Sequence, residues 1–156
     1  MDSLWAPWRN VYVKAKPKRK CLFCLAGKKQ KSDKNNLVLK RTKHSFSILN
    51  RYPYNNAHIM IAPYRHVKSL ELLRDEELLD IVKLLNYTKK KIEKLLKPEG
   101  FNIGVNLGRI AGAGIPGHVH IHIVPRWGGD TNFMPAIANT KVISASLKES
   151  YKLFKG

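Results

Sequence analysis

The feature that most constrains the fold is the octet GHVHIHIV at residues 117–124. It places His118, His120 and His122 at alternate positions, with Val or Ile between them. Because successive side chains of a strand point to opposite faces, one face would carry the three imidazoles and the other would carry only apolar residues. The octet therefore predicts a strand with one face in a hydrophobic core and a row of ligands or bases on the other.

The rest of the chain predicts a sheet interrupted by one long helix. Apolar clusters of strand length lie at 37–40, 45–50, 58–63 and 101–106, and apolar residues recur at helical spacing over 75–97. The turn RYPYNNA makes the second and third clusters a hairpin, and the fourth pairs with the octet. A short helix is expected around 147–154. The predicted fold class is α+β, an antiparallel sheet with one long helix and a short C-terminal helix.

The length of 156 residues predicts one domain, 1–156. We interpret residues 1–36 as an irregular basic arm packed on that domain. The arm contains both cysteines of the chain, Cys21 and Cys24. In a reducing compartment this spacing favours a metal or redox pair over a structural disulfide.

Composition limits the partners and the location. The formal net charge of +18 would attract nucleic acid, acidic surfaces or polyphosphate, and charge alone does not choose among them. The chain has no apolar run of about 18 residues, and its start lacks the layout of a signal peptide. We therefore expect a soluble, cytoplasmic protein without a membrane partner.

The histidine row permits three kinds of chemistry. A neutral imidazole can bind a metal, transfer a proton or attack an electrophile near neutral pH. A glycine-rich loop precedes the row, with Gly108, Gly112, Gly114 and Gly117 within ten residues, and it follows Asn106. Glycines allow several backbone N–H groups to point at one anion. An anion pocket beside a nucleophile is therefore the favoured interpretation.

Longer motifs identify a family. HVHIHIV matches in full the signature of the histidine triad (HIT) family of nucleotide hydrolases and transferases, and the chain resembles that family along nearly its whole length. FSILNRYPYNNAHIMIAPYRHV, FNIGVNLGRIAGAG and PRWGGDTNFMP are the other matching segments. LWAPWR and CLFC look like the microbial branch, which is similar to the fragile histidine triad protein and to diadenosine tetraphosphate phosphorylases and hydrolases. The resemblance implies a HIT-like fold.

The resemblance also implies catalytic roles. His120 corresponds to the nucleophile, which forms a covalent nucleoside-monophosphoryl imidazole. His122 corresponds to the residue that holds a phosphate oxygen or the leaving group, and His58 to an accessory histidine that supports the triad. His118 is the first triad histidine.

Substrate contacts are implied in the same way. Asn50 matches the position that binds the ribose hydroxyls, and Asn106 matches an amide near the phosphate. The expected substrate-binding residues are Asn50, Asn106, Gly112, Ala113, Gly114 and Trp127. Trp127 could stack on a base or form interface area. Ile115 stands where many relatives carry Ser or Thr, so that hydroxyl contact is absent.

Several family members with this Cys-x-x-Cys near the start hold a structural zinc, and the resemblance implies one here. The matching ligands here are Cys21, Cys24, His66 and His118, and two thiolates with two imidazoles suit tetrahedral zinc. The resemblance also implies a homodimer whose sheets join across a two-fold axis.

The expected function is that of a dinucleoside polyphosphate hydrolase or phosphorylase. A nucleoside phosphoramidase or nucleotidyl transferase of the same family is the first alternative. A basic nucleotide- or nucleic-acid-binding module is the second.

Overall fold

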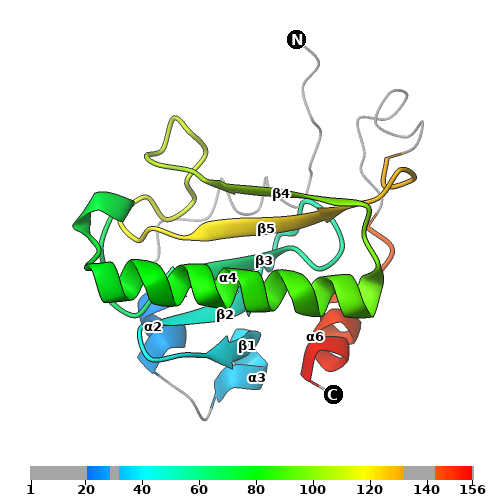
Figure 1. Cartoon of the computed structure of the whole chain (residues 1–156), viewed down its shortest axis with the longest axis horizontal. Helices are drawn as coiled ribbons and strands as arrows, with labels where there is room; N and C mark the ends of the chain where they lie inside the picture. The colour runs from blue at the N-terminus through cyan, green and yellow to red at the C-terminus, as the bar shows by residue number, and fades with distance from the viewer. Residues whose placement is uncertain (1–20, 29–31, 132–142, 156) are drawn as a thin grey trace.

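A computed structural model describes residues 21–28, 32–131 and 143–155. Its centre is a five-stranded sheet in the order β1-β2-β3-β5-β4, in which all neighbours are antiparallel (Figure 1). The strands are β1 (Val38–Arg41), β2 (Ser45–Leu49), β3 (Ile59–Pro63), β4 (Gly100–Val105) and β5 (Ile121–Arg126). The helices are α2 (Leu22–Lys28), α3 (Asp33–Asn36), the 3-10 helix η2 (Leu70–Leu72), α4 (Asp75–Leu96) and α6 (Leu147–Lys155).

This architecture confirms the predicted fold class. β2 and β3 form the expected hairpin, and β4 pairs with β5. The two pairs become one sheet because β3 also pairs with β5, with Met60 opposite His122. The helix α4 lies across one face of the sheet (Figure 1). Its first turn holds three acidic residues, and their negative charges stabilise the helix by interacting with the positive end of its dipole.

The expectation of an irregular segment before residue 37 was wrong, because α2 and α3 lie within its described part. In α2 the buried residues are Phe23 and Ala26, three positions apart on one helix face. They pack with Phe46 and Met60 on the sheet, and this contact stabilises so short a helix. Residues 1–20 and 29–31, which include LWAPWR, lie outside the described residues.

The strand expected from the octet begins later than predicted, at Ile121. Continuing the β3–β5 register would place Val119 opposite Pro63, which has no N–H group to donate. The N–H of Val119 instead donates to the carbonyl of Val67 at 2.7 Å. Of the three triad histidines only His122 is therefore in the strand. His118 lies at a bend, where its N–H donates to the carbonyl of Ile115, and His120 directly precedes the strand.

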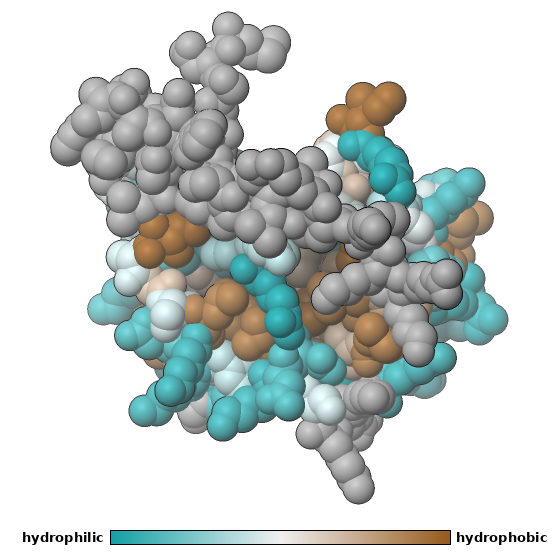
Figure 2. Space-filling model, turned by 180° about the vertical axis from the view of Figure 1, so that it is seen from behind, coloured by the Kyte–Doolittle hydropathy of each residue, from teal (hydrophilic) through white to brown (hydrophobic). Residues whose placement is uncertain are grey.

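The sheet has a hydrophobic cluster on each face. Under α4, the buried residues include Ile59, Ile61 and Ile123 of the sheet together with Ile81 and Leu84 of the helix. The opposite face is the one seen in Figure 2, where apolar residues gather near the middle of the view. No helix in the described parts of the chain combines the length and the apolar character needed to cross a membrane.

Candidate active site and metal cluster

The structure brings the three triad histidines to the sheet face opposite α4. Val119 and Ile123 are buried in the cluster under α4, so the alternate histidines point the other way. The rings of His120 and His122 have centroids 4.8 Å apart. The predicted division of the octet into an apolar face and an imidazole face is therefore confirmed.

A main-chain contact sets the tautomer of His120. Its Nδ1 lies 2.9 Å from the carbonyl oxygen of His118. A carbonyl can only accept, so Nδ1 carries the proton and donates, which leaves Nε2 of the neutral ring with a free electron pair. Burial lowers the pKa of His120 against the opposing effect of this hydrogen bond. The ring is thus neutral, oriented and able to attack an electrophile through Nε2.

His58 and His122 form a directed chain of hydrogen bonds. The backbone N–H of Tyr54 donates to His58 Nδ1 at 3.1 Å, so that nitrogen is an acceptor. His58 then carries its proton on Nε2 and donates to His122 Nδ1 at 2.8 Å. His122 must in turn hold its proton on Nε2. Burial, and then the nearby His122 and His120, lower the pKa of His58 to about 3, so this ring stays neutral.

Asn50 supports this chain from the end of β2. Its Nδ2 lies 3.3 Å from His58 Nδ1, and its Oδ1 accepts from the backbone N–H of Tyr52 at 2.9 Å. Both ends of the amide therefore have partners within the turn after β2. The predicted contact with a ribose stays a prediction.

The glycine-rich loop lies between β4 and the triad. Gly108 and Gly112 have φ of 85° and 90°, a region that favours glycine. A Cβ at Gly112 would lie 3.7 Å from Asn106 Nδ2, so the predicted phosphate-binding amide is beside the loop. The N–H groups of Gly112 and Ala113 donate to the carbonyls of Arg109 and Gly108 within the loop. Contacts from the loop to a phosphate stay predictions for Gly112, Ala113 and Gly114.

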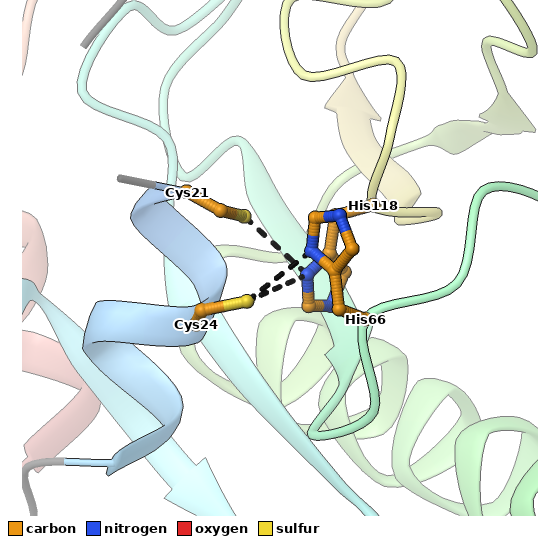
Figure 3. A group of neighbouring side chains, drawn as sticks. All are labelled: Cys21, Cys24, His66 and His118. Atoms are coloured by element: carbon orange, nitrogen blue, oxygen red, sulfur yellow. Dashed lines mark hydrogen bonds between the residues drawn. The ribbon is translucent and has the colours of Figure 1, made fainter. Parts of the chain in front are cut away.

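Four predicted metal ligands meet at one point although they come from three separate segments (Figure 3). The donor atoms of Cys21, Cys24, His66 and His118 all lie within 4.8 Å of one another. Cys21 Sγ is 3.4 Å from His118 Nδ1, and Cys24 Sγ is 3.2 Å from His66 Nδ1. This cluster could hold a metal ion.

The geometry fits a tetrahedral ion with sulfur and nitrogen ligands. Zinc lies about 2.3 Å from sulfur and about 2.0–2.1 Å from nitrogen, which separates S and N donors by about 3.6 Å in a tetrahedron. His118 Nε2 donates to the carbonyl oxygen of Pro63 at 2.9 Å, so Nδ1 is unprotonated and faces the cysteines. Burial and the adjacent Cys21 raise the pKa of the Cys24 thiol. A divalent cation would offset that effect by stabilising both thiolates.

Phe23 joins the metal cluster to the histidine row. It lies between the two cysteines in the sequence, and its ring centroid is 5.2 Å from that of His118 and 4.7 Å from that of His120. Sequence reasoning missed Phe23, and its position inside CLFC was the available signal. It also missed Tyr54, whose ring lies 4.7 Å from that of His58.

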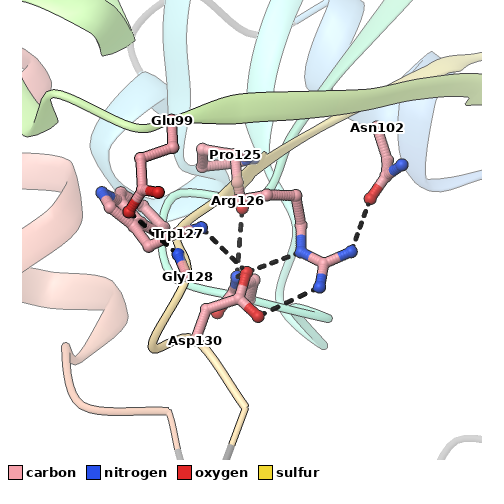
Figure 4. A network of polar contacts seen from close by, with 8 residues as sticks. Glu99, Asn102, Pro125, Arg126, Trp127, Gly128 and Asp130 are labelled. Atoms are coloured by element: carbon pink, nitrogen blue, oxygen red, sulfur yellow. Dashed lines mark hydrogen bonds and ion pairs between the residues drawn. The ribbon is translucent and has the colours of Figure 1, made fainter.

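Trp127 lies at the other end of β5. It is five positions after His122 in the sequence, which corresponds to roughly 16 Å along a strand at about 3.3 Å per residue. Its indole N–H donates to the carbonyl of Leu96 at 3.2 Å, and its backbone N–H donates to Asp130. Asp130 also accepts from Arg126, which reaches Asn102 as well (Figure 4). These contacts hold Trp127 against the end of α4, and its proposed stacking on a base stays a prediction.

The antiparallel sheet, the three alternating imidazoles and the supporting His58 define a histidine triad protein. The HIT domain family model matches residues 31–129, which is more than half of the chain. The chain therefore belongs to the HIT family, as its motifs predicted.

Named relatives cover most of the chain. An AP-4-A phosphorylase of Mycobacterium tuberculosis is 38% identical over 98% of this chain and 82% of the relative. Adenosine 5'-monophosphoramidase hnt1 of Schizosaccharomyces pombe is 35% identical over 68% of this chain and 74% of the relative. Among solved structures, a zinc-bound histidine triad family protein of Mycobacterium smegmatis has a TM-score of 0.67 at 21% identity and covers 87% of this chain and 91% of its own. At 21% identity, the similarity to the Mycobacterium smegmatis protein shows a shared fold.

Proposed function

We propose that this protein is a dinucleoside polyphosphate phosphorylase or hydrolase that acts through a covalent nucleotidyl intermediate on His120. The observation that carries the proposal is the hydrogen bond from His120 Nδ1 to a main-chain carbonyl, which leaves Nε2 available for attack. The phosphorylase relative, which matches nearly the whole chain, supports the choice of substrate class.

In the first step His120 Nε2 attacks the α-phosphorus of the substrate. An N–P bond forms, and the P–O bond to the rest of the phosphate chain breaks. His122 is placed to donate its Nε2 proton to an oxygen that gains negative charge, because its Nδ1 accepts from His58. For diadenosine tetraphosphate the leaving product is ATP, and AMP remains on the imidazole.

In the second step an oxygen nucleophile attacks the same phosphorus and releases His120. Water would give AMP, and inorganic phosphate would give ADP. The relative that is 38% identical to this chain is a phosphorylase, so we expect inorganic phosphate as the acceptor. Asn50 would contact the ribose, and Asn106 with the loop at Gly112–Gly114 would contact the phosphates.

Product analysis with diadenosine tetraphosphate, with and without inorganic phosphate, tests the proposal. We expect ADP and ATP, formed only when phosphate is present. AMP and ATP in its absence would identify a hydrolase. If the dinucleotide is not consumed and adenosine 5'-phosphoramidate is, the phosphoramidase alternative, which the hnt1 relative favours, replaces the proposal.

We further propose a structural zinc ion held by Cys21, Cys24, His66 and His118. Four protein ligands leave no open position, so the ion would supply stability by tying α2 to the loop after β3 and to the triad segment. By holding His118, the ion would also fix the carbonyl that orients His120.

The remaining proposals concern the whole chain. We propose a single domain over 1–156, a cytoplasmic location and a homodimer. The homodimer proposal is supported by β4, an edge strand of the sheet with an exposed Ile103.

A further inference from the structure

A small polar cavity lies on the sheet face opposite the triad. It has a volume of about 200 Å³ and is bounded by β1, β2, α4 and the end of α6. Ser47 lines it from β2, where its neighbours Phe46 and Ile48 face the other way into the cluster with Phe23. The sheet therefore separates this cavity from the histidines.

Thr88 of α4 brings an unsatisfied hydroxyl to the cavity. The residue is 4% exposed, and its Oγ1 is buried without a hydrogen-bond partner in the described parts of the chain. A buried hydroxyl without a partner destabilises the fold, because it has lost its hydrogen bonds to water and gained none in the protein. A bound group that accepts its proton would remove that cost.

Three lysines surround the same cavity, and no carboxylate is among its described lining residues. Lys91 Nζ donates to the carbonyl of Phe154 at 2.5 Å, which leaves two of its three N–H groups for another acceptor. Lys40 Nζ is held 4.2 Å from the centre of the Tyr87 ring. Lys155 joins them from α6. Three positive charges around one cavity repel, and an anion between them would offset the repulsion.

We propose that this cavity binds a phosphate group, in the form of free inorganic phosphate. A tetrahedral oxyanion accepts from the Thr88 hydroxyl and from Lys40, Lys91 and Lys155 at once, and needs no donor of its own. The volume is below the roughly 300–1,000 Å³ typical of sites for larger ligands, so one small anion fits better than a nucleotide. This proposal does not rest on the proposed catalytic function.

Amide NMR of the full chain, titrated with inorganic phosphate at constant ionic strength, tests the site directly. We expect saturable shifts at the amides of Ser47, Thr88 and Lys91. Thr88→Val keeps the shape but removes the hydroxyl, and should weaken binding there by about tenfold. Thr88→Ser restores the hydroxyl and should restore the affinity.

Charge variants and a second ligand complete the test. Lys155→Gln should weaken phosphate binding, and Lys83→Gln, an exposed lysine of α4 that does not line the cavity, should not. Equal weakening in both, shifts that never saturate, or unchanged affinity in Thr88→Val would overturn the proposal. AMP should leave these amides unmoved, and tighter binding of AMP than of phosphate would overturn the assignment to a free anion. Shifts at the Asn106 amide would report phosphate binding at the triad site, and they count neither for nor against the cavity.

Discussion

Main-chain hydrogen bonds give the triad imidazoles different protonation patterns. His118 and His120 donate to carbonyl oxygens through opposite nitrogens, Nε2 and Nδ1. The accessory His58 instead accepts a main-chain N–H through Nδ1 and donates through Nε2 to Nδ1 of the third triad residue, His122, which therefore carries its proton on Nε2. Identical side chains in one row can therefore serve as metal ligand, nucleophile and proton donor. This division leads to predictions at single residues.

His120→Ala should lower turnover by about a thousandfold or more while nucleotide still binds, because the attacking atom is lost and the phosphate contacts remain. Rate measurements with a binding assay test this, and mass spectrometry of a quenched parent reaction should place a nucleoside monophosphate on His120. His44→Ala, which removes a histidine distant in sequence from the row, is the matched control. Turnover near the parent rate in the His120 variant would assign the chemistry to another group.

The double substitution Cys21→Ser, Cys24→Ser should remove about one zinc ion per chain. It should also lower Tm by at least about 5 °C, because binding energy of the ion is folding energy. Elemental analysis and thermal unfolding of protein purified without added metal measure both effects. Metal content that is the same in parent and variant would contradict the zinc proposal. Addition of a chelator to the parent should reproduce the loss of stability.

At the scale of elements, α2 packs on the sheet through Phe23, an aromatic side chain that is 1% exposed, and Arg41 of β1 donates to the carbonyls of Ala26 and Gly27. The helix has only seven residues, so its stability comes from this packing and from the cysteine cluster. Loss of the Phe23 ring should also increase the mobility of the His118 and His120 rings, which it contacts.

Phe23→Ala should lower the free energy of unfolding by about 3–5 kcal/mol, the usual cost of emptying a buried aromatic site. Leu25→Ala on the same helix is the control, because Leu25 is 39% exposed and should cost far less. Urea unfolding measures the difference. Equal losses in the two variants would mean that α2 is not docked through Phe23.

The start of α4 carries a pH-sensitive contact. Glu77 accepts from Arg65 Nε at 3.0 Å and Nη2 at 2.6 Å, and from the backbone N–H of Arg74 at 2.8 Å. The Arg65 guanidinium is the main reason that the pKa of Glu77 falls from 4.5 to about 2. Because the folded-state pKa is the lower one, this carboxylate stabilises the fold fully above about pH 4.5, and the stabilisation is lost as the pH falls toward 2.

Glu77→Gln should therefore destabilise the protein near neutral pH and have little effect near pH 2. Thermal or urea unfolding of parent and variant across this range gives the difference as a function of pH. Glu76→Gln is the control, since Glu76 is exposed and its contact with Arg74 is long, at 4.0 Å. A Glu77 difference that stays constant with pH would contradict the ion-pair explanation.

At the scale of the whole molecule, the sheet ends in an edge, and the net charge is +18. An edge strand presents unpaired backbone groups on which a second sheet can add. The charge would also attract nucleic acid, and such binding should weaken steeply with salt. Catalytic turnover should instead follow the presence of His120.

Ile103→Lys should convert a dimer to a monomer if β4 is the interface, because a charged side chain on an edge strand opposes pairing. Ile103 is 44% exposed, so the substitution should leave the fold intact. Sedimentation velocity of parent and variant measures the change. Leu153→Lys, at an exposed residue of α6, is the control. A parent that sediments as a monomer would remove the dimer proposal.

The amino-acid sequence by itself determined the local elements and the fold class. The hairpin of β2 and β3, the strand β4 and the helix α4 were predicted within one or two residues at their ends, because hydrophobic period and turn residues act over short distances. The pairing of β4 with β5 was predicted as well, although β5 begins four residues after the octet does. The two faces of the triad segment follow from the same alternation. The family motifs then indicated which residues to examine for catalysis and metal binding.

Only the tertiary structure decided what depends on contacts between distant segments. Cys21 and His118 are 97 residues apart, and their meeting depends on α2, whose helical form comes from burying Phe23 on the sheet. The octet starts its strand late because Pro63, on another strand, has no N–H to offer. The tautomer of His120 and the cavity around Thr88 likewise depend on neighbours set by the folded backbone. No local pattern contains that information, because it arises from packing.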